Sequence, residues 1–315
     1  MKPVFISMVA TGLLIMVSCE KFEEIDISFN SILSLAEGEK KLLTANFESA
    51  SNKSVTWRSD KPDIAAVNNK GEVTAKSTGM ATITATPKSS MPPMTCVVAV
   101  NAASMISQSL QTILHIAGSG TLNINWGDDQ LIETHTLEND MHRYEHMRSL
   151  GFHYTTLLTG KKITHLDCSS VGLYSLNVSN LTELIALECQ YNYLIGDKGN
   201  SLVVSNNTRL GYLNCEWCWL PSLDVSYNKE LTYLNCSSNR LTSLDVSSNT
   251  ELIRLSCGAN QMEAEALNAL FRTLPVNNND TFLEKTVRIG NNPGTDFCDK
   301  SIATAKGWTV IDQYD

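Results

Sequence analysis

The sequence predicts a multidomain, mostly β protein organised around a solenoid of stacked coils. Over residues 163–262, leucine and cysteine recur in one phase with a period of about 21 residues, as in the shortest solenoid repeats. Before them, short runs with period-two apolar alternation are separated by turn-forming residues, as in β-strands. We expect a β-sandwich over 26–101, a small β-domain over 102–162 that covers the N-terminal end of the solenoid, and an α/β C-terminal cap over 263–315.

The repeat follows the consensus LxxLxCxxNxLxxLDVSxNxx, which Leu231–Glu251 matches best. One coil cannot bury its own leucines, so coils must stack, and their first segments form a parallel sheet. Leucines at positions 1, 4 and 11 and cysteine at position 6 then lie inside, while Asn at position 9 binds bent backbone. One coil, Leu184–Arg209, carries about five extra residues within Ile195–Ser201. The in-phase segments are Ile163–Cys168, Leu184–Cys189, Leu210–Cys215, Leu231–Cys236 and Leu252–Cys257.

Five coils in register resemble bacterial leucine-rich repeats. Two coils depart from the pattern, with Val171 and Cys218 in place of the asparagine at position 9. The resemblance implies a solenoid whose outer wall is free to contact another molecule.

Cysteine usage is organised by the repeat. Of nine cysteines, five share position 6, whereas a disulfide framework shows pairs at irregular spacings and zinc needs four converging ligands. We interpret the five as small buried apolar residues. Cys96, Cys218 and Cys298 are left without an assigned role.

Residues 1–18 predict a signal peptide, because Lys2 precedes an apolar run over Val4–Val17 that is too short to span a bilayer. The run ends Met-Val-Ser-Cys19, which resembles the lipobox of bacterial lipoproteins. That resemblance implies acylation of Cys19, a linker over 19–25 and a lipid anchor in the outer membrane. The acidic segment Glu20–Glu24 resembles an export tag to the cell surface. The alternative is a plain secretory signal with a coincidental cysteine.

The segments Val55–Val67, Gly71–Ala75 and Gly79–Ala85 resemble the group 2 bacterial Ig-like domain of intimin- and invasin-type surface proteins. The resemblance implies a spacer or adhesive module with Trp57 as its core aromatic residue. The segment Trp126-Gly-Asp-Asp resembles the turn of PKD-type β-sandwiches. It follows strands that the sequence predicts at Ile113–Ile116 and Leu122–Trp126.

After Met262, apolar residues at helical spacing predict one helix, and Asp296 is positioned to cap a second. Trp308 is expected in the core of this cap.

Composition and motifs argue against several classes of function. A net charge of −9 and a pI near 5.2 argue against nucleic acid as a partner. No phosphate-binding loop or nucleophile elbow occurs, so we expect no cofactor. His142 and His146 at i, i+4 spacing would share a helical face and suggest a metal site. The alternative, which we favour, is a loop that is histidine-rich by chance.

Aromatic residues mark the candidate ligand-binding surface. Tyr191, Tyr193, Trp217 and Trp219 occupy positions 8 and 10 of two adjacent coils, at the end of the sheet. Exposed aromatic clusters with polar neighbours are typical of binding surfaces. The alternative is that the insertion folds over these rings. The remaining candidate residues are Glu188, Glu216, Tyr212 and Tyr233.

Asp167 and Glu188 occupy the same position of adjacent coils, which predicts carboxyl groups roughly 5 Å apart, as in retaining glycosidases. A deep pocket is not indicated, so we expect a non-enzymatic protein. The predicted function is a lipid-anchored, cell-surface adhesion or binding protein that recognises a protein or a glycan. One alternative is a structural envelope lipoprotein that docks a partner protein, and another is an enzyme acting on polysaccharide.

Overall fold

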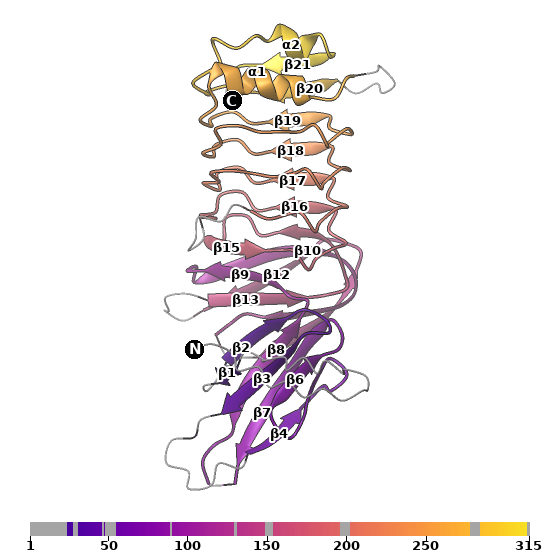
Figure 1. Ribbon diagram of the computed structural model, residues 1–315, viewed down its shortest axis with the longest axis vertical. Helices are drawn as coiled ribbons and strands as arrows, with labels where there is room; N and C mark the ends of the chain where they lie inside the picture. Colours follow the sequence, from indigo (N-terminus) through magenta and orange to yellow (C-terminus); the bar gives the residue numbers. More distant parts are fainter. Residues whose placement is uncertain are drawn as a thin grey trace, which may run out of the picture.

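The structure is a computed structural model that describes residues 24–27, 31–45, 47, 55–88, 90–128, 131–148, 154–195, 202–277 and 284–313. These residues form an elongated molecule with a two-sheet domain at one end, stacked coils in the middle and short helices at the other end (Figure 1). They are mostly β, as predicted. The predicted signal peptide and Cys19 lie outside the described residues.

The N-terminal domain contains, over its described residues, two four-stranded sheets ordered β1-β3-β6-β5 and β2-β8-β7-β4. Side chains alternate between the two faces of β7, so Ala81, Ile83 and Ala85 lie between the sheets. Trp57, the expected core aromatic residue, packs against this core but is only partly buried. The strands are β1 (Glu24–Ile27), β2 (Ser31–Leu35), β3 (Lys40–Ala45), β4 (Val55–Ser59), β5 (Ala65–Val67), β6 (Glu72–Ala75), β7 (Gly79–Pro87) and β8 (Met94–Val100).

The next region is built on one long strand, β10 (Gln111–Asn125), where the sequence predicts two separate strands. Gly118 and Gly120 have φ of 154° and 84°, and the pairing of β10 with β14 shifts register at Ala117/Gly118. A Cβ at Gly118 would lie 2.1 Å from the Lys162 carbonyl oxygen, so only glycine lets the two backbones approach here. The other strands are β9 (Ala103–Ser107), β11 (Ile132–Glu138), β12 (His142–Met147) and β13 (Tyr154–Thr159).

The sheet continues from this region into the repeats. Across the described residues it has thirteen strands, and β10 pairs antiparallel with β14 (Lys162–Asp167), the first strand of the repeats. A single apolar cluster extends from Ala103 to Trp308. Sheet and core therefore both cross the predicted boundary at residue 162.

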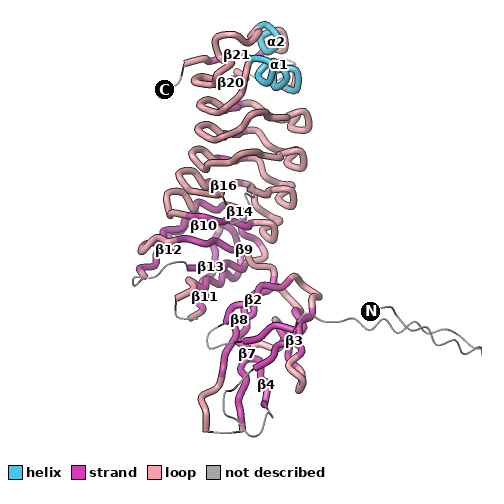
Figure 2. Tube along the Cα trace, turned by 60° about the vertical axis from the view of Figure 1, so that its left-hand side comes forward, coloured by secondary structure: helices cyan, strands magenta, loops and turns pink. Residues whose placement is uncertain are grey.

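The repeat strands form a parallel ladder in the register that the sequence period implies. Leu166, Leu187, Leu213, Leu234 and Leu255 pair in turn and are buried. Figure 2 shows the coils one above another, with α1 and α2 at the end of the stack. One strand, β15 (Leu173–Asn177), instead pairs antiparallel with β9. The ladder strands after β14 are β16 (Ala186–Glu188), β17 (Tyr212–Asn214), β18 (Tyr233–Asn235) and β19 (Arg254–Ser256).

The five cysteines at position 6 are fully buried and reduced. Three of these thiols, those of Cys168, Cys189 and Cys257, donate to a backbone carbonyl of the following coil at 3.5 Å. They therefore fill the interior and also join neighbouring coils.

Buried asparagines hold the turns. At position 9, the Asn239 amide donates to the carbonyls of Cys215 and Cys236, and its Oδ1 accepts from the amides of Cys218 and Leu220. Cys218 replaces this asparagine in the preceding coil, and its thiol donates to the Cys189 carbonyl at 3.0 Å. A second ladder, which the sequence analysis did not single out, joins coils on the opposite side through Asn207, Asn228 and Asn249.

The C-terminal segment extends the ladder with β20 (Lys285–Arg288) and β21 (Trp308–Ile311) and adds α1 (Ala264–Thr273) and α2 (Ser301–Thr304). Trp308 is buried, and its Nε1 donates to the Pro275 carbonyl at 2.7 Å. The predicted cap at Asp296 is wrong. The helix starts later, and it is the Asp299 carboxylate that accepts from the Ser301 amide at 3.1 Å.

Candidate binding surface

The register of the ladder places outward side chains in two columns on the sheet face. One column is His165, Ala186, Tyr212, Tyr233 and Arg254, and the other is Asp167, Glu188, Asn214, Asn235 and Ser256. These positions alternate with the buried leucines because side chains of a strand point to opposite faces.

Tyr212 and Tyr233 stack face to face on this surface. Their ring centroids lie 4.4 Å apart with an interplanar angle of 4°. Partial burial, the adjacent Tyr233 and the negative charge of Glu188 raise the pKa of Tyr212 to about 12. The hydroxyl of Tyr212 is therefore a neutral hydrogen-bonding group at physiological pH.

Two carboxylates lie on β14 and β16, the ladder strands that precede the tyrosine strands β17 and β18. Asp167 and Glu188 are direct neighbours in the ladder, as predicted. Asp167 is engaged locally, because its Oδ1 accepts from the Ser169 amide at 2.9 Å and its Oδ2 lies 3.3 Å from His115 Nδ1. These contacts order the turn that follows β14.

The aromatic residues lie at the turn beside the sheet, and we call Tyr191, Tyr193, Trp217 and Trp219 the aromatic edge. Tyr191, Tyr193 and Trp217 are exposed to 54%, 51% and 50%. Trp219 is half-buried between two neighbours. Tyr193 stacks on it at 5.6 Å, and the Arg240 guanidinium lies 4.3 Å from its ring centroid. Residues 196–201, most of the insertion that in the alternative interpretation folds over these rings, lie outside the described residues.

The structure thus separates residues that the sequence treats alike. Trp219 has both ring faces in contact with the protein, so it orders the edge. Tyr191 and Trp217 present about half of their surface to solvent. Arg240 occupies position 10 of the next coil, in line with Tyr193 and Trp219. Comparing that position one coil further along the sequence would have identified it.

The backbone at position 8 is left-handed in every coil described. Tyr191 and Trp217 have φ of 60° and 52°, and Ser238 and Ala259 in the following coils have 57° and 51°. This conformation costs an L-residue about 1 kcal/mol or more, and glycine, which has no Cβ, adopts it most readily. The coil geometry requires the turn, whereas the fold does not require large aromatic residues in it.

Carboxylates join the aromatic edge to the sheet face. The Glu216 carboxylate accepts from Asn235 Nδ2 at 3.2 Å, and Glu188 accepts from Gln190 Nε2 at 3.5 Å. A groove of about 250 Å³ lies beside the edge. It is lined by Trp217, Trp219, Ser238, Asn239, Arg240 and Ala259.

The histidine pair lies on a strand, so neither the favoured loop nor the helical face of the alternative interpretation is present. His142 and His146 lie on strand β12, where i and i+4 are about 13 Å apart. His146 instead contacts the Asp128 carboxylate at 2.7 Å and stacks on Trp126 at 5.1 Å. In the part of the chain that the structure describes, no group of three or more potential ligands is placed to hold a metal ion.

Residues 21–98 match the family model of the bacterial Ig-like domain (group 2), which confirms the predicted Ig-like domain. A search of curated protein sequences finds no match. Within the described ranges, the structure contains no helix with the length and apolar character that crossing a membrane requires.

Among solved structures, the chain is similar to the functional domain of InlJ from Listeria monocytogenes, which is described as including a cysteine ladder. The two are 27% identical, the match covers 49% of this chain and 32% of that chain, and the TM-score is 0.37. An internalin, InlF, from the same species has 19% identity, covering 44% and 37%, with a TM-score of 0.35. A leucine-rich-repeat protein of Leptospira interrogans has 20% identity, covering 46% and 36%, with a TM-score of 0.32. The chain spans about a third of the length of each of these proteins.

Proposed function

We propose that the protein is a lipid-anchored, non-enzymatic binding protein of the cell surface that recognises a protein or a glycan through its repeats. In this proposal Cys19 carries the anchor in the outer membrane, and the Ig-like domain holds the repeats away from the membrane. The aromatic edge is the main contact, with Tyr212, Tyr233, Glu188 and Glu216 beside it.

The observation that carries the proposal is the exposure of Tyr191, Tyr193 and Trp217 on adjacent coils. Large aromatic side chains fixed at one place on a rigid scaffold supply binding energy with little loss of conformational entropy. Glu188 and Glu216 beside them supply hydrogen-bond acceptors that orient a ligand.

Capture experiments test the binding role. The chain from Glu20 onward is presented to glycan arrays and to envelope extracts, beside a Trp217→Gly variant. We expect glycan or protein capture by the parent chain, with at least tenfold loss in the variant, because a central aromatic contact contributes roughly 2 kcal/mol or more. Capture that the variant retains in full would contradict the role of the aromatic edge.

The anchor and the absence of catalysis have separate tests. Metabolic labelling with a radioactive fatty acid should mark the wild-type chain and not Cys19→Ser, which should leave the membrane fraction. Any glycan bound by the protein should be recovered intact. Turnover of a glycan that is lost in Glu188→Gln would overturn the non-enzymatic role.

A further inference from the structure

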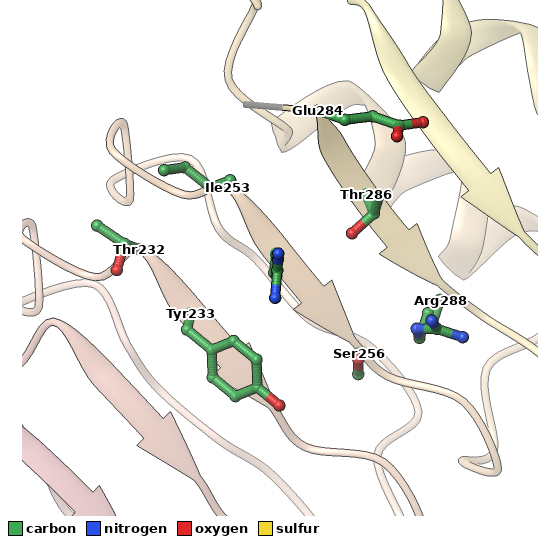
Figure 3. A pocket seen from close by; sticks show the side chains of 8 residues that line it. Thr232, Tyr233, Ile253, Ser256, Glu284, Thr286 and Arg288 are labelled. Carbon is green, nitrogen blue, oxygen red and sulfur yellow. The ribbon is translucent and has the colours of Figure 1, made fainter. Parts of the chain in front are cut away.

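A second cavity, of about 680 Å³, opens on the sheet face toward the C-terminal end of the stack. Three neighbouring strands line it, with Tyr233 on β18, Arg254 and Ser256 on β19, and Thr286 and Arg288 on β20. Figure 3 shows these strands side by side, with Ser256 and Arg288 near the C-terminal ends of β19 and β20. None of these residues belongs to the aromatic edge.

The cavity is basic although the protein is acidic. Arg254 and Arg288 are both exposed. The pairing of Arg254 with Thr286 and of Ser256 with Arg288 puts the two arginines on one face, diagonally across strands about 4.8 Å apart. Among the lining residues that the structure describes, the acidic one is Glu284, which accepts a hydrogen bond from Thr309 Oγ1 at 2.6 Å. Asp167 and Glu188 lie several strands away, beyond about one Debye length at physiological salt.

The rest of the lining consists mainly of hydroxyl groups. Ser256 and Thr286 contribute two, and the phenol of Tyr233 contributes a third. One face of the Tyr233 ring stacks on Tyr212, so the ring is fixed in position, and its opposite face is directed along the ladder toward β19. Ile253 is the other apolar residue of the lining.

We propose that this cavity, the basic sheet pocket, binds a carboxylated sugar of an acidic polysaccharide. The planar guanidinium groups of Arg254 and Arg288 match a carboxylate and form charge-assisted hydrogen bonds with it. The hydroxyl groups pair with sugar hydroxyls, and the Tyr233 ring supports the apolar face of the sugar. We favour a sugar over an acidic peptide because hydroxyl groups outnumber the apolar side chains of the lining.

Calorimetric titration of the full chain with tetragalacturonate tests the pocket. We expect binding that weakens as salt is raised. Arg254→Ala and Arg288→Ala should each weaken it about tenfold to a hundredfold, the usual effect of losing a charged hydrogen bond. Arg254→Lys should recover part of the loss. The matched control is Arg272→Ala, an exposed arginine on α1 outside the pocket, which should bind as the parent does.

Three results would overturn the proposal. They are no binding by the full chain at low salt, equal binding of the methyl-esterified tetrasaccharide, and equally tight, equally arginine-dependent binding of a tetraglutamate peptide. The test is separable from that of the aromatic edge. Trp217→Gly should retain tetragalacturonate binding, and Arg254→Ala should retain capture through the aromatic edge. Unchanged melting temperatures of the arginine variants will show that losses are local.

Discussion

The adjacent coils Leu210–Glu230 and Leu231–Glu251 share length and frame but differ at the turn after the strand. In the later coil, Asn239 fills the turn and joins three segments of backbone. In the earlier coil, Cys218 fills it, its thiol takes over one bond, and Trp217 and Trp219 flank it with φ of 52° and 63°. The stack thus tolerates one missing asparagine because Cys218 replaces its bonds to the preceding coil, through its thiol to the Cys189 carbonyl and its carbonyl to the Leu194 amide, while Asn239 of the next coil still binds the Cys215 carbonyl.

Replacing Asn239, the buried asparagine of the later coil, should have the largest effect. The side chain of Asn239 makes five hydrogen bonds to backbone, all buried. We expect Asn239→Ala to lower the free energy of unfolding by about 3–5 kcal/mol, because several backbone groups of two coils lose their partners together. Urea unfolding measures this. Asn235→Ala, which removes a half-buried asparagine of the same coil, is the control and should cost about 1 kcal/mol or less. If both variants lost the same free energy of unfolding, the hydrogen bonds of Asn239 would not be what joins the two coils.

Each of the two coils has a buried thiol at position 6, and stability at high pH tests the burial of these thiols. Burial raises the pKa of Cys236 from 9.0 to about 12. The folded thiol keeps its proton above pH 9 while the unfolded thiol loses it, so stability is full below pH 9 and falls as pH rises toward 12. The slope for one thiol approaches ~1.4 kcal/mol per pH unit. Urea midpoints at several values between pH 8 and 11 should fall less steeply in Cys236→Ala. Parallel slopes would mean that Cys236 titrates alike in both states.

The two tryptophans sharpen the comparison. Trp219 packs between Tyr193 and Arg240, so Trp219→Ala should lower the free energy of unfolding by about 1–3 kcal/mol through lost stacking and cation–π contacts. Differential scanning calorimetry should show a drop of several degrees, and Arg240→Ala a smaller one. An unchanged melting temperature would show that the stack contributes nothing to stability.

Trp217 should behave in the opposite way. Glycine suits its left-handed backbone, so we expect Trp217→Gly to leave stability within about 1 kcal/mol of the parent while ligand capture is lost. Ser238→Gly, at the same position of the next coil, is the matched control and should keep capture. A destabilised Trp217→Gly variant would indicate that the exposed ring packs as part of the core.

Much of the fold follows from periodicity, which reports burial directly. The in-phase leucines and cysteines can be recognised directly in the sequence, and the strands of the ladder pair in the register that they imply. The sequence did not predict that β10 is continuous or that His142–Met147 is a strand, because both depend on pairing with segments distant in the chain. The later start of α2 reflects turn chemistry at Asp299, one of two aspartates placed close to the helix.

The candidate site was predictable in position and not in detail. Tyr191, Tyr193, Trp217 and Trp219 could be placed at the turn because positions 8 and 10 follow the strand. That Trp219 is enclosed, that Arg240 encloses it and that Tyr191 and Trp217 are left-handed are properties of contacts between coils. The basic sheet pocket likewise needs Arg288, which lies in a strand outside the repeat period.

By itself, the sequence determined which side chains face inward and which face outward, because a fixed period on a stacked coil assigns every position to one wall. The tertiary structure decided which outward residues touch one another, and that the sheet starts in β10 before the first repeat. Those outcomes depend on how neighbouring side chains pack against one another and on pairing with strands outside the repeat, for which the repeat period gives no register.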